Sequence, residues 1–202
     1  MVNYLDIVPF ILKWEGGKAK HPEHGGGFTN KGITYETFNN LALKVLKVAP
    51  SWQIFDNLTD QQAGLFVKYF FDMATGGNKV KTPAIAYMLT EWYFNSGKGG
   101  LISFQRMLNQ KFGAKLTEDG VIGPKSLAVI NSVNQKQLYD TAIAWRANFY
   151  KTIAKQPDKA KFLKGWLNRL NDFATKYPAP IIGATAGILF GLGLLFFLIN
   201  NK

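Results

Sequence analysis

A glutamate between a tryptophan and two glycines is the first residue of this sequence whose surroundings suggest chemistry. Glu15 follows the apolar residues of a predicted first helix and precedes Gly16 and Gly17, so we expect its carboxyl at the floor of a cleft and partly out of water. Loss of water disfavours the charged form and raises the pKa of a carboxyl. Such a carboxyl can act as a general acid near neutral pH. The alternative is a glutamate that is solvated or ion-paired near a helix end.

Other residue types narrow the chemistry further. The chain of 202 residues has no cysteine, which excludes disulfides, thiolate zinc sites and cysteine nucleophiles. Its two histidines, His21 and His24, lie in a stretch rich in proline and glycine, which we interpret as a solvated loop rather than a metal site. We therefore predict a chemistry that uses no metal and no cofactor.

The formal net charge of +11 favours a polyanionic partner. Nucleic acid, an anionic membrane surface and an acidic cell-wall polymer all have this property. The sequence shows no dense run of basic residues with interleaved aromatics and no zinc-finger or helix-turn-helix signature. We therefore predict a partner other than nucleic acid.

Helix signals dominate residues 1–176. Asn3, Thr34 and Thr59 are predicted N-caps, Thr59 forms a capping box with Gln62, and Thr82-Pro83 opens a helix that runs towards residues 95–97. Further helices are predicted over 99–112, 125–132, 136–155 and 159–175. Only residues 26–33 have a strand pattern, with Asn30-Lys31-Gly32 as the turn. The predicted fold is a mainly α globule with one small β-hairpin next to Glu15.

A composition change at residues 177–180, Tyr-Pro-Ala-Pro, marks a linker. The following residues, 181–199, carry no charge, and as a helix they would span about 28 Å, enough to cross a bilayer. This pattern predicts a C-terminal transmembrane helix and a single-pass, tail-anchored protein of a virion membrane or a bacterial inner membrane. Gly183, Gly187 and Gly191 would share one helix face, which predicts a homo-oligomer through that face.

Four ordered motifs resemble one enzyme family. They are W-E-G-G at 14–17, P-E-H-G-G-G-F-T-N-K-G-I-T at 22–34, N-S-G at 95–97 and D-G-V-I-G-P-K-S-L at 119–127. Together with F-L-K-G-W-L-N-R at 162–169, they resemble glycoside hydrolase family 108, the N-acetylmuramidases with a C-terminal peptidoglycan-binding-type segment. The resemblance implies an α+β lysozyme-like fold with a muramidase catalytic region at 1–97 and a peptidoglycan-binding-type helical segment at 98–176 packed on it.

The resemblance also implies site residues. It makes Glu15 the acid that cleaves the β-1,4 bond between N-acetylmuramic acid and N-acetylglucosamine in peptidoglycan. Related enzymes position the attacking water with an aspartate and a threonine. In this sequence the threonine position is Thr29, whereas the aspartate position is His24, with the neighbouring Glu23 as an alternative.

Four residues are expected to bind substrate. Gly16 and Gly27 would let the sugar chain approach the backbone, Tyr93 would stack on a sugar ring, and Asn95 would bind an N-acetyl group. Core packing for Tyr93 and a helix C-cap for Asn95 are the alternatives.

The sequence therefore predicts a membrane-anchored muramidase with which a bacteriophage enters or lyses its host. A catalytically decayed, wall-binding membrane protein is one alternative, because His24 stands where an aspartate is expected. A bacterial enzyme of wall remodelling or secretion is another. A nucleic-acid-binding membrane protein is a third.

Overall fold

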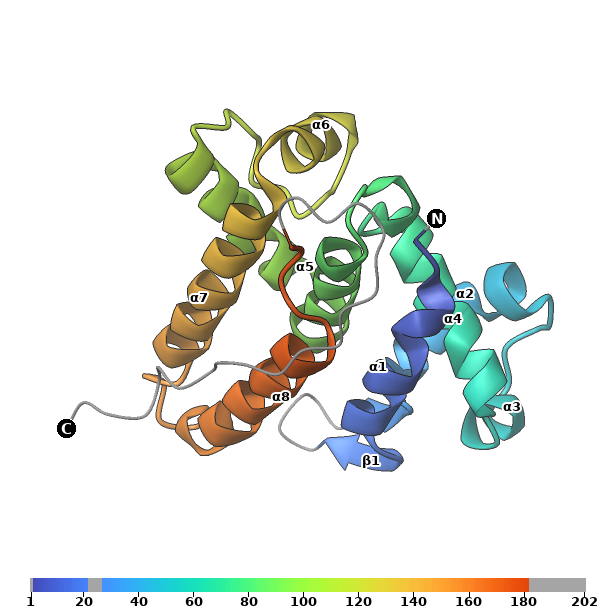
Figure 1. Ribbon diagram of the computed structural model, residues 1–202. Coiled ribbons are helices and arrows are strands. Elements are labelled where there is room, and N and C mark those ends of the chain that lie inside the picture. Colours follow the sequence, from blue (N-terminus) through green and yellow to red (C-terminus); the bar gives the residue numbers. More distant parts are fainter. Residues whose placement is uncertain (1, 22–26, 182–202) are drawn as a thin grey trace.

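A computed structural model describes residues 2–21 and 27–181, and helices make up most of it (Figure 1). The helices are η1 (Tyr4–Asp6), α1 (Val8–Glu15), α2 (Tyr35–Leu46), α3 (Trp52–Asp56), α4 (Asp60–Met73), η3 (Gly77–Lys79), α5 (Pro83–Phe112), α6 (Pro124–Ser132), α7 (Gln135–Ile153), η4 (Ala160–Phe162) and α8 (Leu163–Lys176). The strands are β1 (Lys18–His21), β2 (Gly27–Asn30) and β3 (Ile33–Thr34). The predicted mainly α fold with a small antiparallel sheet is confirmed.

Side-chain caps explain where several helices begin. The Thr34 hydroxyl accepts a hydrogen bond from the Thr37 amide at the start of α2. Thr59 and Gln62 form the predicted capping box at the start of α4, with each side chain accepting from the other residue's amide. Asn3 caps the short helix η1 instead of α1. The α-helix begins only at Val8, with Pro9 in its first turn, where a missing amide hydrogen costs nothing.

The three strands form one antiparallel sheet in the order β1-β2-β3. The predicted strand region appears as β2 and β3, joined by a turn in which Lys31 and Gly32 have positive φ angles. Asn30 fixes this hairpin to α3, because its side-chain amide donates to the Phe55 carbonyl at 2.7 Å. Strand β1 was not predicted, because Lys-Ala-Lys-His has no apolar alternation. It forms by pairing Lys18 with Asn30 and Ala19 with Thr29.

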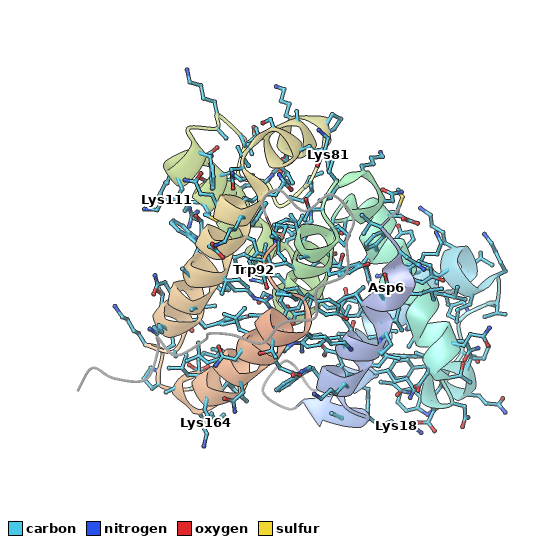
Figure 2. All side chains as sticks on the ribbon, in the orientation of Figure 1. Asp6, Lys18, Lys81, Trp92, Lys111 and Lys164 are labelled. Carbon is cyan, nitrogen blue, oxygen red and sulfur yellow. The ribbon has the colours of Figure 1, made fainter. Side chains whose placement is uncertain are left out.

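Helix α5 runs through the middle of the molecule and consists of two helical segments that meet at Gly97. Gly97 has φ 55° and ψ −146°, which is not helical, so the break lies in the N-S-G motif, where the sequence predicted one helix to end and the next to begin. Residues 85–92 of α5 are all buried. Trp92 lies among the central helices in Figure 2, and its ring contacts those of Phe104 and Phe149.

The last helix returns to the first. In Figure 1, α8 lies between α7 and α1. Trp14 of α1 donates through its indole nitrogen to Asp172 of α8 at 2.7 Å, and Lys13 pairs with the same carboxylate at 2.8 Å. Just beyond α8, the Tyr177 hydroxyl donates to the Asp6 carbonyl at 2.6 Å. The two ends of the described chain are therefore held together by several polar contacts.

The predicted membrane localisation is wrong. Over residues 2–21 and 27–181, none of the helices has both the length and the apolar character needed to cross a bilayer. The helix expected at 181–199 lies, apart from Ile181, outside the described residues, as do Gly183, Gly187 and Gly191.

Candidate active site

Glu15 is the last residue of α1, and the hairpin turn packs directly on it. Gly16 ends the helix with a positive φ of 65°, so the chain turns away towards β1. A Cβ atom placed on Gly32 would lie 2.5 Å from the Glu15 Cγ atom. The turn residue must therefore lack a side chain for the hairpin to approach the carboxyl this closely.

The Glu15 carboxyl is largely buried and is paired with an arginine. Its Oε1 atom lies 2.7 Å from Nη1 of Arg169 on α8, and the Glu15 side chain is 17% exposed. The same guanidinium donates through Nε to Oε1 of Glu91 on α5. One arginine from the last helix thus joins two carboxylates from two other helices.

Glu91 belongs to a buried polar network that continues away from Glu15. The second Glu91 oxygen accepts from Nη1 of Arg146 on α7. The Nε atom of Arg146 donates to the Tyr150 hydroxyl at 2.7 Å, and that hydroxyl donates to Oδ1 of Asn95 at 2.6 Å. Glu91 and Arg146 are both fully buried.

The pKa values of Glu15 and Glu91 are shifted in opposite directions. Burial raises the pKa of Glu15 above its ordinary value, and the negative charge of Glu91 adds to this, although the Arg169 charge opposes it. Burial also acts to raise the pKa of Glu91, but there Arg146 and Arg169 together outweigh it and the pKa falls below its ordinary value. Two carboxyls whose pKa values are pushed apart can take different roles, one as a proton donor and one as a fixed charge.

The other predicted site residues occupy different places. Thr29 lies half-buried on β2, and its hydroxyl donates to the Ala19 carbonyl at 3.4 Å. Gly27 is the exposed first residue of the same strand. His24 and Glu23 lie outside the described residues.

Tyr93 and Asn95 contact protein side chains. The Tyr93 ring packs on Phe70 with 5.2 Å between centroids, so the core-packing alternative describes its observed contact. The Asn95 side chain accepts from Tyr150 inside the buried network, and the residue lies two positions before the helix break at Gly97.

A surface groove of about 640 Å³ lies along α1 and the hairpin turn; Gly16 lines it, whereas the neighbouring Glu15 does not. It is lined by Val8, Pro9, Leu12, Lys13, Gly16, Lys31, Asp60 and Gln61. Gly16 follows Glu15 in the chain, and Lys31 precedes the turn glycine that touches the Glu15 side chain. The groove therefore runs next to the backbone that holds the carboxyl.

The arginines of the site were not predicted from the sequence. Arg169 was noted only as the end of a matching motif, and Arg146 and Tyr150 were not singled out. Their signal was weak but present, since arginine accounts for only three of the 24 basic residues and two of those three lie in this network.

A helical fold with a small sheet beside a glutamic acid of raised pKa is the arrangement of a lysozyme-like glycoside hydrolase. Residues 8–97 match the family model described as Glycosyl hydrolase 108, and residues 100–171 match the one described as Predicted Peptidoglycan domain. Residues 8–97 are therefore a glycosyl hydrolase family 108 domain. The protein is a glycoside hydrolase of the N-acetylmuramidase type, and its substrate is peptidoglycan.

One solved structure shares the fold over most of the chain. The structure of Brucella abortus SagA superposes with a TM-score of 0.67 at 21% sequence identity, covering 86% of this chain and 92% of that one. No curated protein matches the chain.

Proposed function

We propose that this protein cleaves the β-1,4 bond between N-acetylmuramic acid and N-acetylglucosamine, with Glu15 as the general acid. The proposal is carried by the position of Glu15, which is largely buried at the end of α1 under the hairpin turn at Gly32. Burial raises its pKa, which favours the protonated form that a general acid needs. The adjacent groove, which passes Gly16, offers a path for the sugar chain.

In the proposed reaction the Glu15 proton moves to the glycosidic oxygen as the bond from that oxygen to the anomeric carbon breaks. Water adds to the anomeric carbon and gives one proton to the proposed base, and a proton from solvent then restores Glu15 as the base releases its own. Within residues 2–21 and 27–181, no group donates a well-aligned hydrogen bond to Glu15 Oε1, although the Arg169 guanidinium lies beside it.

The attacking water is assigned to the hairpin. Thr29 makes only a long hydrogen bond within the sheet, so its hydroxyl can also bind water. We keep His24 as the proposed base, with Glu23 as its alternative. Glu91 is a poor candidate for that role, because its two oxygens are both held by arginines inside the core.

The proposed setting is a bacteriophage that enters or lyses its host, since both events require the wall to be cut. Remodelling of the wall by a bacterium uses the same reaction and is the second candidate. The net charge of +11 suits binding to an anionic wall in either case.

The Glu15→Gln variant tests the assignment. Digestion of purified sacculi by the parent should release muropeptides with reducing N-acetylmuramic acid ends, identified by mass. Glu15→Gln should lower the rate at least about 100-fold, which is the contribution expected of general acid catalysis. Glu118→Gln is the matched control, because Glu118 is a partly exposed glutamate in an ion pair with Arg106.

The control should retain the parent rate. If Glu15→Gln cleaves sacculi as fast as the parent, Glu15 is not the acid. If the parent binds sacculi and releases no fragments, and the variant binds equally well, the protein is a wall-binding scaffold.

A further inference from the structure

The proposed reaction assigns no role to Glu91, a buried acidic residue. Glu91 is fully buried, it is charged, and it contacts neither solvent nor the groove beside Glu15. Burying a carboxylate costs several kcal/mol unless partners compensate. Here both partners are arginines from the C-terminal third of the chain, on α7 and α8. Such an arrangement calls for an explanation beyond packing.

We propose that Glu91 is a positioning residue for Glu15, which it orients and keeps protonated by holding and neutralising Arg169. This inference rests on the proposed role of Glu15 as the acid. It also gives Arg146 and Arg169, which lie in the peptidoglycan-domain match, a part in positioning the proposed acid.

The geometry supports the orienting half of the proposal. A guanidinium is planar, so fixing its Nε atom on Glu91 also fixes where its Nη1 atom points. That Nη1 atom lies 2.7 Å from Glu15 Oε1. On its other side, the Glu15 side chain is confined by Gly32, which leaves no room even for a methyl group. The carboxyl is thus held between the hairpin turn and an arginine whose position Glu91 sets.

The charges of the cluster support the second part of the proposal, that Glu91 keeps Glu15 protonated. An arginine alone beside Glu15 would stabilise its carboxylate and remove the proton that a general acid needs. Glu91 offsets that charge, and with Glu15 ionised the cluster holds two carboxylates and two guanidiniums. When Glu15 is protonated, Glu91 is the one carboxylate between the two guanidiniums and the cluster carries one net positive charge. Without Glu91 it would carry two, which would favour ionisation of Glu15 more strongly.

The remaining charged groups around Glu15 have other partners. Asp172 of α8 pairs with Lys13 of α1, Lys18 of β1 pairs with Asp56, and Lys31 of the hairpin turn pairs with Asp60 of α4. Tyr150 of α7 donates to Asn95, and its raised pKa, caused by burial, keeps it neutral. Arg169 and Glu91 are therefore the charges with most influence on Glu15.

The test is the pH dependence of kcat/KM for the isosteric variant Glu91→Gln. Activity falls at alkaline pH when the acid loses its proton. Without Glu91, Arg169 stabilises the Glu15 carboxylate more strongly, and we expect this alkaline limb to move to lower pH by about one unit. A carbon-13 titration of the Glu15 carboxyl should show the same displacement. Its resonance is identified by its disappearance in Glu15→Gln.

Two further variants keep the test decisive. Glu118→Gln should leave the alkaline limb where it is in the parent. If Glu91→Gln does not fold, the double variant Glu91→Gln with Arg146→Gln replaces it, because this variant leaves the buried net charge unchanged. It still removes the carboxylate that pairs with Arg169. The alkaline limb of the pH profile should move in the same direction as in Glu91→Gln, by less.

The inference is overturned if a folded Glu91 variant has the same alkaline limb of kcat/KM and the same Glu15 carbon-13 titration as the parent. That result leaves the proposed function intact if Glu15→Gln is inactive. Conversely, an active Glu15→Gln variant removes the proposed function, whereas the carbon-13 titration still reports whether Glu91 controls the Glu15 proton.

Discussion

A glutamic acid prepared to hold its proton is also a source of instability once it is charged. The Glu15 pKa is raised mainly by burial, and the ordinary value of about 4.5 applies to the unfolded chain. The contribution of protonated Glu15 to the free energy of unfolding is therefore complete below that value. It is lost as the pH rises through the pKa that Glu15 has in the folded protein, because a charged carboxyl is then buried.

Replacing Glu15 by glutamine should therefore stabilise the protein at neutral pH while it abolishes activity. The gain in melting temperature over the parent should be close to zero at about pH 4 and should grow as the pH rises towards 7, because only the parent has an acid to ionise. Thermal unfolding followed by circular dichroism across this range measures it. Glu118→Gln should show no such growing gain, and an equal gain at every pH would contradict the burial argument.

The sequence located the acid but could not locate its partners. Glu15 was recognisable from the residues beside it in the chain. Arg146 lies 55 residues and Arg169 lies 78 residues from Glu91, and no local spacing relates them. The scarcity of arginine among the basic residues was a usable signal, since arginine is favoured over lysine in buried pairs with carboxylates. It could identify two residues of interest but not the carboxylates they hold.

At the level of elements, the hairpin turn controls how closely the sheet approaches the acid. Gly32 has a φ of 77°, and the space where its side chain would be is filled by Glu15. The turn sequence was predictable because Asn-Lys-Gly favours a tight hairpin. Strand β1 and the short helix α3 were not, because each is fixed by partners elsewhere. The Asn30 side chain, for example, holds β2 to the carbonyls at the end of α3.

Gly32→Ala should lower activity by more than its loss of stability explains. Its methyl group would collide with Glu15 and displace the carboxyl, so sacculus cleavage should fall at least about tenfold, the loss expected of a misplaced general acid. Gly113→Ala is the matched control, because Gly113 also has a positive φ but has nothing within 4 Å of the added Cβ. Both variants should lose about 1 kcal/mol of unfolding free energy. Equal activity losses in the two would show that strain, not contact with Glu15, is responsible.

Across the whole molecule, the two family matches describe parts that share one core. Helix α5 passes through the boundary between residues 97 and 100, and Gly100 approaches the Trp92 ring so closely that a Cβ there would lie 2.6 Å from it. The sequence predicted a helix end here because of Asn-Ser-Gly, and the helical geometry does break at Gly97. Packing of Gly100 on Trp92 nevertheless holds the two segments of α5 together across the break.

The full chain should therefore unfold in a single transition. Tryptophan fluorescence, which includes Trp92 at the junction, and far-ultraviolet circular dichroism should give coincident curves in urea. Two separated transitions would mean that residues 8–97 and 100–171 fold independently.

Because the arginine beside the acid comes from the last described helix, the order in which a ribosome makes this chain has a consequence. A nascent chain that has emerged only as far as α7 already contains Glu15, the hairpin and Glu91, yet it lacks Arg169. On the proposed assignment, the active site is complete only after α8 has been translated. Products that end before α8 should then be inactive on purified sacculi.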